Sequence, residues 1–417
     1  MDFLLASRRR AAARRRVGLG ALAGLCVATL ALVACGPVGS GGTGAPAGAA
    51  AASSFGQGPI NGFGSILVNG VHYEDATALV VDEDGRALSA QADLHLGSIV
   101  EVVGEPVSAD AVAATQIRVH VDLVGPLGTT YDPTTRSLTL LGQVVLVDPA
   151  TTFVDGIAGG LAALGPGAVV EVSSLYDPVS GIYHATRIAA RPDAASYAVR
   201  GAIIALGAGS VRIGTDSFDY GTLASAADFQ VGQIVRLTLR TDPTDLGHWT
   251  VTAIASGVSL PPDRRSGDLR GAVGKVIDER HVFVDGVLVD ASAATFVPSD
   301  RTLGRGALVV VHGTMAGAVL VASRVDFPVP DRFIVGGGTG EASRYANAFE
   351  VEGLILSGVD TESRTFAMRG PTTVDYSRAN FLEGGASSLV QGRKVAVQGA
   401  LSADGTRLVA TTIRVEE

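Results

Sequence analysis

One eight-residue pattern constrains this 417-residue chain most, because it occurs five times at regular intervals. Each copy opens with a glycine, has a valine three residues later, and has a valine or leucine two residues after that. The copies begin at Gly97, Gly167, Gly232, Gly306 and Gly392. Side chains alternate across a β-strand, so the two apolar positions predict one buried face. The position between them, which indicates a mostly solvated opposite face, holds Glu101, Glu171, Arg236, Val310 and Ala396.

Each copy sits in a unit with four other predicted strands. A strand containing a glycine comes first, at residues 61–64, 124–127, 200–203, 270–273 and 352–355. Two short alternating strands around a turn follow, most clearly from Val282 to Asp290, where Asp285-Gly286 is a strong hairpin signal. A small segment, such as the one ending at Phe153, predicts a plug at one end of a barrel. A closing strand follows the glycine pattern, for example the one ending at Val415.

Five strands in roughly 60 to 70 residues suit one small OB-like or SH3-like β-barrel. Apolar residues make up 47% of the chain but aromatic residues only 5%, which favours small cores of β-branched side chains. We therefore expect an all-β chain of five tandem barrels at residues 58–121, 122–192, 197–257, 268–328 and 347–417. Proline-containing linkers, such as the one at Pro261-Pro262, predict separate cores, whereas the first two units meet across only Val121-Asp122.

The order of these motifs resembles the bacterial domain-of-unknown-function family numbered 5666. The resemblance covers nearly all of the chain after Gly58, in five copies, and the third unit departs from it most. It implies tandem small OB-like barrels in a secreted protein or lipoprotein, with no established activity.

The N-terminal residues resemble a bacterial lipoprotein signal. Arginines stand at positions 8 to 10 and 14 to 16, an uncharged run extends from Val17 to Ala34, and Leu32-Val33-Ala34-Cys35 resembles the lipobox. The resemblance implies that residues 1–34 are a signal peptide, cleaved between Ala34 and Cys35. It also implies that Cys35 is acylated and that Gly36 directs the protein to the outer membrane. A retained membrane span and plain secretion are the alternatives.

The positions of the two cysteines agree with the predicted lipoprotein signal. Cys26 lies inside the leader and Cys35 is the expected lipidation site, so the folded part has no other thiol for a disulfide or a thiolate metal site. Residues 35–57 are mainly Gly, Ala, Ser and Pro, which predicts a flexible tether after the lipidated cysteine.

Charge argues against nucleic-acid partners. Without the leader the chain has 26 basic and 40 acidic residues, a net charge of −14, and its lysines are Lys275 and Lys394. Such a surface has little capacity to release counterions from a phosphate backbone. Because no later apolar stretch is long enough to cross a bilayer, the acyl chains are the expected membrane attachment.

Motifs for catalysis, metals or cofactors are not evident. The chain has no G-x-S-x-G elbow, and the glycine runs at 56–64 and 336–338 lack the Lys-Ser/Thr pair of a phosphate loop. The turn Asp82-Glu83-Asp84-Gly85 lacks the remaining calcium-loop ligands. Structural or solvated roles are expected for His72, His95, His120, His184, His248, His281 and His312. We expect no enzyme, metal or cofactor, although paired glycosidase carboxylates are identified only by their spatial separation.

Two functions remain. The first is a lipid-anchored, non-enzymatic array of barrels in the cell envelope, contacting envelope proteins or itself. The second is an array that binds glycans on its barrel faces. The best candidates for exposed aromatic stacking platforms are Tyr73, Tyr131, Tyr183, Trp249 and Tyr376, with Trp249 more typical of core.

Overall fold

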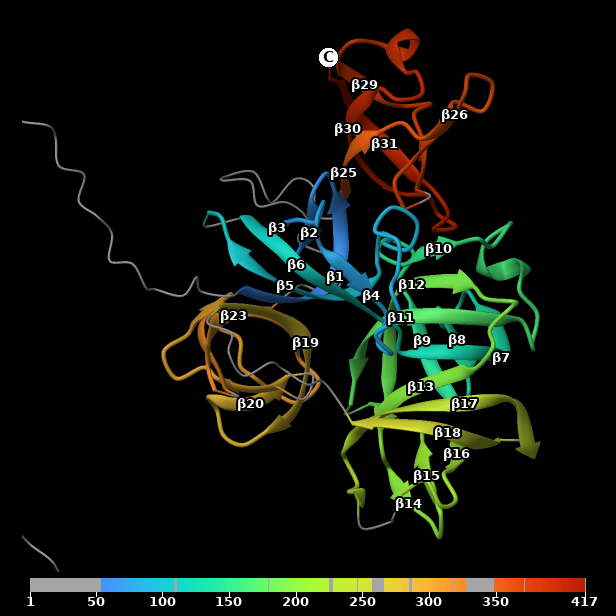
Figure 1. Cartoon of the computed structure of the whole chain (residues 1–417), viewed down its shortest axis with the longest axis vertical. Coiled ribbons are helices and arrows are strands. Elements are labelled where there is room, and N and C mark those ends of the chain that lie inside the picture. Colours follow the sequence, from blue (N-terminus) through green and yellow to red (C-terminus); the bar gives the residue numbers. More distant parts are fainter. Residues whose placement is uncertain are drawn as a thin grey trace, which may run out of the picture. The chain divides into compact units, whose positions relative to one another are not determined.

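A computed structural model describes residues 54–416 apart from 109–110, 179, 225–227, 246, 257–265, 285–286, 318, 328–348 and 371. Within these residues the regular elements are β-strands and two short 3-10 turns, η1 (Leu161–Ala163) and η3 (Ala386–Ser388) (Figure 1). The prediction of an all-β fold with small barrels is confirmed. The predicted signal peptide, Cys35 and most of the tether lie outside the described residues.

The strands form five consecutive groups, which we name barrels 1 to 5. Barrel 1 contains β1 (Ser54–Phe63), β2 (Ile66–Val68), β3 (Val71–Glu74), β4 (Leu79–Val81), β5 (Ile99–Pro106) and β6 (Ala111–His120). Barrel 2 contains β7 (Leu123–Asp132), β8 (Ser137–Leu140), β9 (Gln143–Val147), β10 (Phe153–Asp155), β11 (Val169–Asp177) and β12 (Ile182–Ala190). Barrel 3 contains β13 (Tyr197–Ala202), β14 (Ala205–Leu206), β15 (Ser210–Ile213), β16 (Asp216–Asp219), β17 (Ile234–Asp245) and β18 (His248–Ser256).

The last two groups follow the same order. Barrel 4 contains β19 (Ser266–Val276), β20 (His281–Val284), β21 (Val287–Asp290), β22 (Thr295–Val297), β23 (Leu308–Ala316) and β24 (Val319–Asp326). Barrel 5 contains β25 (Phe349–Leu354), β26 (Ser357–Asp360), β27 (Thr365–Met368), β28 (Thr372–Asp375), β29 (Asn380–Glu383), β30 (Lys394–Leu401) and β31 (Leu408–Val415).

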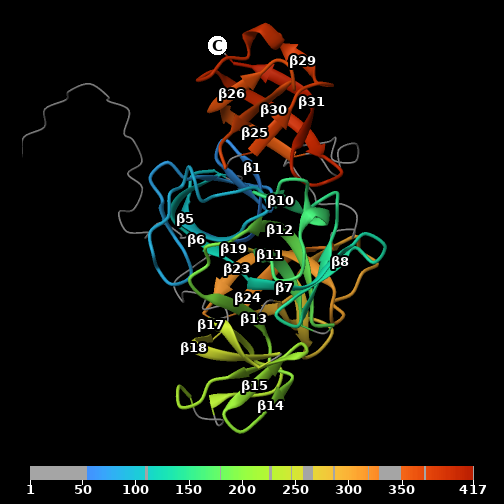
Figure 2. The same ribbon diagram turned by 90° about the vertical axis from the view of Figure 1, so that its right-hand side faces the viewer.

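Strand pairing closes barrels 1, 2 and 4 completely. In barrel 1, β1 pairs with β2 and β5, β2 pairs with β3, β3 runs parallel to β6, and β6 pairs with β5. Barrels 2 and 4 repeat this scheme, which is that of an OB-like barrel. In barrel 3, Ile204 N–H, between β13 and β14, donates to Arg212 O on β15, and in barrel 5, Leu356 N–H, between β25 and β26, donates to Ala367 O on β27. Figure 2 shows β25, β30 and β31 of barrel 5 side by side.

The five pattern glycines adopt one backbone conformation. Their φ angles are all between +78° and +89°, a region that L side chains rarely adopt. Each glycine N–H donates to the carbonyl of a buried residue on the first strand of its barrel or directly after it. Those acceptor residues are Ile60, Leu127, Ile203, Val273 and Ile355. The glycine is therefore required by the sharp turn that leads into the strand.

The predicted buried face is confirmed at every position. The valine three residues after each glycine and the apolar residue two further on are all 0% exposed. The predicted solvated face is wrong at Glu101, Glu171 and Val310, which are 3%, 7% and 8% exposed. The two glutamates pair with basic side chains instead of facing water, as described below.

The prediction of a separate core in every unit is also wrong. Buried apolar side chains of barrels 1 and 5 form one cluster, and those of barrels 2 and 3 form another. Barrel 4 has its own cluster around Val309 and Val311. The described residues from Ser54 onward belong to one compact unit. The Pro261-Pro262 linker lies outside the described residues.

Strand β1 connects three barrels. Its residues Ser54 to Gln57 run parallel to Ser266 to Leu269 of β19, and Gly62 and Phe63 pair with Glu350 and Val351 of β25. The strand begins at Ser54, so the last four residues of the predicted tether are ordered strand instead. The first-strand glycine of barrel 1 is Gly58, not Gly62, because Gly58 lies two residues before Ile60, the acceptor for Gly97.

Candidate functional site: a buried charged junction

The acidic turn at residues 82–85 positions the central residue of this site. The carboxylate of Asp82 accepts hydrogen bonds from the N–H groups of Asp84 and Arg86, at 3.0 and 2.8 Å. Gly85 has a φ of +80°, which lets the chain reverse. The turn directs Glu83 toward barrels 2 and 3, where its side chain is 8% exposed.

Glu83 pairs with three basic side chains from two barrels. Its Oε1 lies 2.8 Å from Nδ1 of His120 at the end of β6, and also contacts the Arg200 guanidinium on β13. Its Oε2 lies 2.7 Å from Nε of Arg236 on β17. Arg236 also reaches Asp84, at 3.0 Å. One carboxylate of barrel 1 is thus neutralised mainly by arginines of barrel 3.

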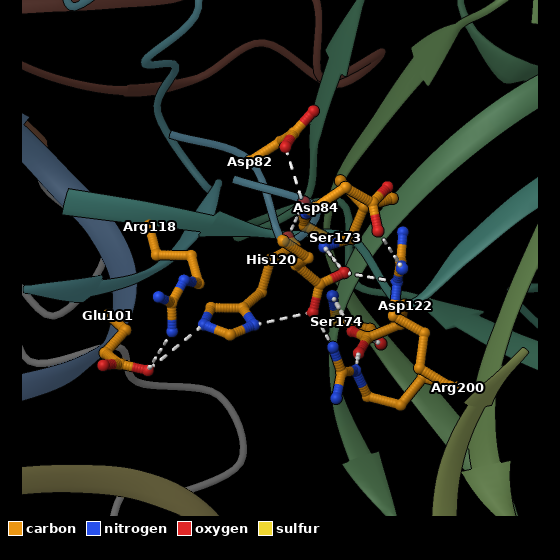
Figure 3. Close-up of polar contacts among 12 residues, drawn as sticks. Asp82, Asp84, Glu101, Arg118, His120, Asp122, Ser173, Ser174 and Arg200 are labelled. Atoms are coloured by element: carbon orange, nitrogen blue, oxygen red, sulfur yellow. Dashed lines mark hydrogen bonds and ion pairs between the residues drawn. The ribbon is translucent and has the colours of Figure 1, made fainter. Parts of the chain in front are cut away.

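Asp122 holds the opposite side of the junction (Figure 3). Its Oδ2 accepts hydrogen bonds from the N–H and hydroxyl of Ser174, at 2.9 and 2.6 Å. Its Oδ1 lies 3.4 Å from Nε of Arg200, and its backbone carbonyl accepts from Arg200 N–H at 2.8 Å. Asp122 therefore ties β11 of barrel 2 to β13 of barrel 3.

Glu101 and Arg118 complete what we call the junction network: Glu83, Glu101, Arg118, His120, Asp122, Arg200 and Arg236. Glu101 Oε2 lies 3.7 Å from His120 Nε2 and 3.8 Å from the Arg118 guanidinium. Apart from Arg118, these side chains are between 3% and 14% exposed. Charges this deeply buried are tolerated only when paired and hydrogen-bonded. Their arrangement fixes the relative positions of three barrels.

A second charged contact joins barrels 1 and 2. Arg187 on β12 reaches Glu171 at 2.5 Å and Asp155 at 2.8 Å, and Asp155 also contacts His95 at 2.9 Å. Burial would raise the pKa of Asp155, but the hydrogen bond from His95 and the charge of Arg187 outweigh it and lower the pKa to about 2. Beside it, the Thr186 hydroxyl donates to the Gly97 carbonyl at 2.6 Å.

Barrel 4 carries a third group of charges, next to β1. His312 lies between Asp268, which it contacts through Nδ1, and Asp326, which is 3.0 Å from Nε2. Arg324 holds Asp326 from the other side, at 2.7 Å. Burial opposes charging of the imidazole, but the hydrogen bonds to the two carboxylates prevail and raise the pKa of His312 to about 9. Asp268 pairs in register with Gly56 of β1.

The remaining histidines have ordinary surroundings. His281 lies 2.9 Å from Asp278, His248 lies 3.8 Å from Asp219, and His72 lies 3.1 Å from the Ser65 hydroxyl. Burial lowers the pKa of His184. Within the described residues, no group of three or more His, Cys, Asp or Glu side chains is arranged to hold a metal ion.

The predicted aromatic platforms are mostly core residues. Tyr73 and Tyr183 are fully buried, Trp249 and Tyr376 are 7% exposed, and only Tyr131 is partly exposed. Trp249 donates its indole N–H to Asp216 at 2.9 Å. Because large side chains are scarce in this chain, those present fill the cores rather than the surface.

Sequence reasoning missed the junction network. Two of its members, Glu101 and Arg236, occupy equivalent positions on glycine-pattern strands, and Glu171, at the same position in barrel 2, belongs to the second charged contact. Alternation alone cannot separate a face covered by water from one covered by another barrel. A usable signal was available: charges of opposite sign recur at this position in the first three copies but not in the last two.

Cys35 and Ala34 lie outside the described residues, so their predicted lipidation and cleavage stay predictions. Among the described residues, no helix is long and apolar enough to cross a membrane. No curated protein matches the chain. Residues 129–189 and 352–414 match the family described as "Domain of unknown function (DUF5666)", and over these two segments, in barrels 2 and 5, the chain is similar to that family.

Proposed function

We propose that this chain is a lipid-anchored, non-enzymatic protein of the bacterial cell envelope. In this proposal its barrels form one joined body that contacts other envelope proteins. The observation that carries the proposal is the junction network, in which charged side chains from three barrels pair with one another. A carboxylate that acts on a substrate must be reachable, whereas Glu83 and Glu101 are buried and paired.

The alternative proposal, glycan binding on the barrel faces, is supported less. Glycan sites rely on exposed aromatic rings, and four of the five candidate rings are buried here. Tyr131, partly exposed on β7, is the remaining candidate platform.

The lipid anchor has a sharp test in the chain's own two cysteines. We expect wild type and Cys26→Ser to incorporate radiolabelled palmitate and to enter the detergent phase of a phase-separation assay. Cys35→Ser should incorporate none and should accumulate as a precursor. Cys35→Ser that keeps its membrane attachment after removal of the leader would refute the lipoprotein assignment.

The contact function is tested by a cross-linked pull-down from envelope extract, with a glycan array in parallel. Wild type should capture a defined envelope protein, and Glu83→Ala, which loosens the joined body, should capture less. Asp84→Ala is the matched control, because its side chain is 68% exposed. Specific glycan binding without any protein capture would favour the alternative.

A further inference from the structure

A cleft of about 1010 Å³ is lined by residues of barrels 1 to 4. This volume is at the upper end of the range for small-molecule sites. One wall is the glycine-pattern turn of barrel 3, residues 230–234. The other wall is residues 274–276 and Arg305 of barrel 4, and the floor includes Tyr176 and Arg200.

Specific contacts hold the barrel 4 wall in place. Strand β19 pairs with β1, and Gly274 near its end packs against Pro178 in the turn after β11. A Cβ atom on Gly274 would lie 2.8 Å from Pro178 Cγ, so only glycine permits this approach. The barrel 4 wall is therefore anchored through β19, whereas the barrel 3 wall is the turn that leads into β17.

Two exposed cations on the barrel 4 wall favour an anionic ligand. Gly306 N–H bonds to Val273 O at 2.8 Å, which places Arg305 and Lys275 on neighbouring backbone segments. Both side chains are exposed, and within the described residues no carboxylate lies within 4.0 Å of either cation. By contrast Lys394, the other lysine beyond the leader, is paired with Glu352 and Glu416.

The cations are particular to barrel 4. The residues that correspond to Lys275 and Arg305, counted from the shared hydrogen-bond register, are uncharged in the other barrels. They are Gly62 and Leu96, Thr129 and Pro166, Ala205 and Val231, and Ser357 and Gln391. A turn position that is neutral in the other four barrels, including Val231 on the opposite wall of the cleft, thus carries a positive charge in barrel 4.

The rest of the cleft offers a hydrogen-bond donor and apolar surface. Tyr176 Oη accepts from Ala202 N–H at 3.0 Å, which leaves its own hydrogen for another acceptor. Burial raises the pKa of Tyr176, so the phenol stays protonated. Val231, 64% exposed, and the half-buried ring of Phe283, 5.7 Å below Lys275 Nζ, supply the apolar surface.

We propose that this cleft binds a small organic anion. Lys275 and Arg305 contact its carboxylate or phosphate group, Tyr176 donates a hydrogen bond to it, and Val231 and Phe283 cover its ring or chain. Charge-assisted hydrogen bonds are the strong contacts in such a site, and they set its selectivity for anions.

Calorimetric titration of the mature protein tests this with three probes: trigalacturonate, inorganic pyrophosphate and neutral maltotriose. We expect at least one anionic probe to bind with a Kd of about 1 mM or lower, and maltotriose not to bind. Trigalacturonate alone would identify the ligand as a carboxylated sugar, and pyrophosphate alone as a phosphorylated compound. Binding should weaken as salt is added.

The matched variants are the double substitution Lys275→Ala with Arg305→Ala, and Arg301→Ala as control. Arg301 is an exposed cation of the same barrel outside the cleft. The double variant should bind at least about tenfold more weakly, and the control should bind as wild type does. Failure of both anions to bind wild type, or equal binding by the double variant, would overturn the proposal. Unchanged thermal melting of both variants would show that the fold is intact.

Discussion

Barrel 1 meets barrels 3 and 5 through two different kinds of contact. Toward barrel 3 it presents Glu83 to two arginines in a buried charged junction. Toward barrel 5 it shares an apolar cluster, which includes Phe63 and Phe349, and it forms one buried ion pair between Asp75 and Arg369. Phe349 also stacks edge-to-face on Phe153 of barrel 2, with ring centroids 4.7 Å apart.

Apolar contacts and buried ion pairs respond differently to the loss of a side chain. An apolar contact loses free energy in proportion to the surface uncovered, and any similar side chain partly restores it. A buried ion pair contributes little net stability when complete, but it leaves an uncompensated charge when one partner is removed. The barrel 3 junction therefore depends mainly on paired charges, whereas the barrel 5 contact combines an apolar cluster with one buried ion pair and with the pairing of β1 with β25.

The largest effect is expected from Glu83→Ala. It leaves Arg200, Arg236 and His120 without their shared carboxylate, which should cost about 3 to 5 kcal/mol in the free energy of unfolding. Urea denaturation measures this, with Asp84→Ala in the same turn as control and a cost under about 1 kcal/mol. Equal losses in the two variants would mean that the junction contributes no more than a surface ion pair.

A smaller loss, about 3 kcal/mol, is expected for Phe349→Ala, because the cluster shared by barrels 1 and 5 is left with a cavity. Phe349→Leu should recover a large part of the loss, as apolar contacts allow. Leu382→Ala, at a side chain 54% exposed, is the control. If Phe349→Leu is as unstable as Phe349→Ala, this contact is as specific as the charged one.

Substitution of two pattern glycines distinguishes the effect of a clash between barrels from the effect of backbone strain in the turn. A Cβ atom on Gly97 would lie 2.2 Å from Thr186 O of barrel 2, whereas Gly232 has no such neighbour within 4 Å. We expect Gly97→Ala to cost about 2 to 3 kcal/mol and Gly232→Ala about 1 kcal/mol, because both strain the backbone but only the first also clashes. Thermal melts of the two variants should differ; identical melting would indicate that barrels 1 and 2 separate readily.

The stability of barrel 4 should respond to pH. The pKa of His312 is raised from 6.5 to about 9, so its stabilising effect is fully present below pH 6.5 and is lost as the pH rises through 9. The change should be about 1 to 2 kcal/mol, given partial exposure of the ring. His312→Gln should remove this pH dependence in urea denaturation, and the exposed-turn control His281→Gln should keep it. An unchanged pH profile in His312→Gln would contradict the assignment.

The sequence predicted those features that depend on one barrel alone. The ten apolar positions of the glycine pattern are buried as expected, since alternation reports which side faces a strand's own core. The Val282 to Asp290 hairpin is also confirmed in the pairing of β20 with β21. Residues 285 and 286, at its turn, lie outside the described residues.

Features that depend on two barrels could not be predicted in this way. Glu101 and Glu171 look like solvated residues because alternation does not show that a basic side chain will pair with each of them. The glycine-rich stretch at 56–64 offered several registers, and only the hydrogen bond from Gly97 to Ile60 selects Gly58. Glu83 looked like part of an ordinary acidic turn because its arginine partners follow more than a hundred residues later.

The pairing of β1 has a consequence for the order in which the chain folds. Residues 54–57 meet β19 about two hundred residues later, and residues 62–63 meet β25 later still. Contacts between such distant segments slow folding, because a long loop must close before they form. During synthesis one edge of β1 stays unpaired until barrel 4 has emerged, and an unpaired edge can join with other chains. Although β1 is made before the other described strands, it is therefore among the last to be completed, so a chaperone that covers its edge would bind early and dissociate late.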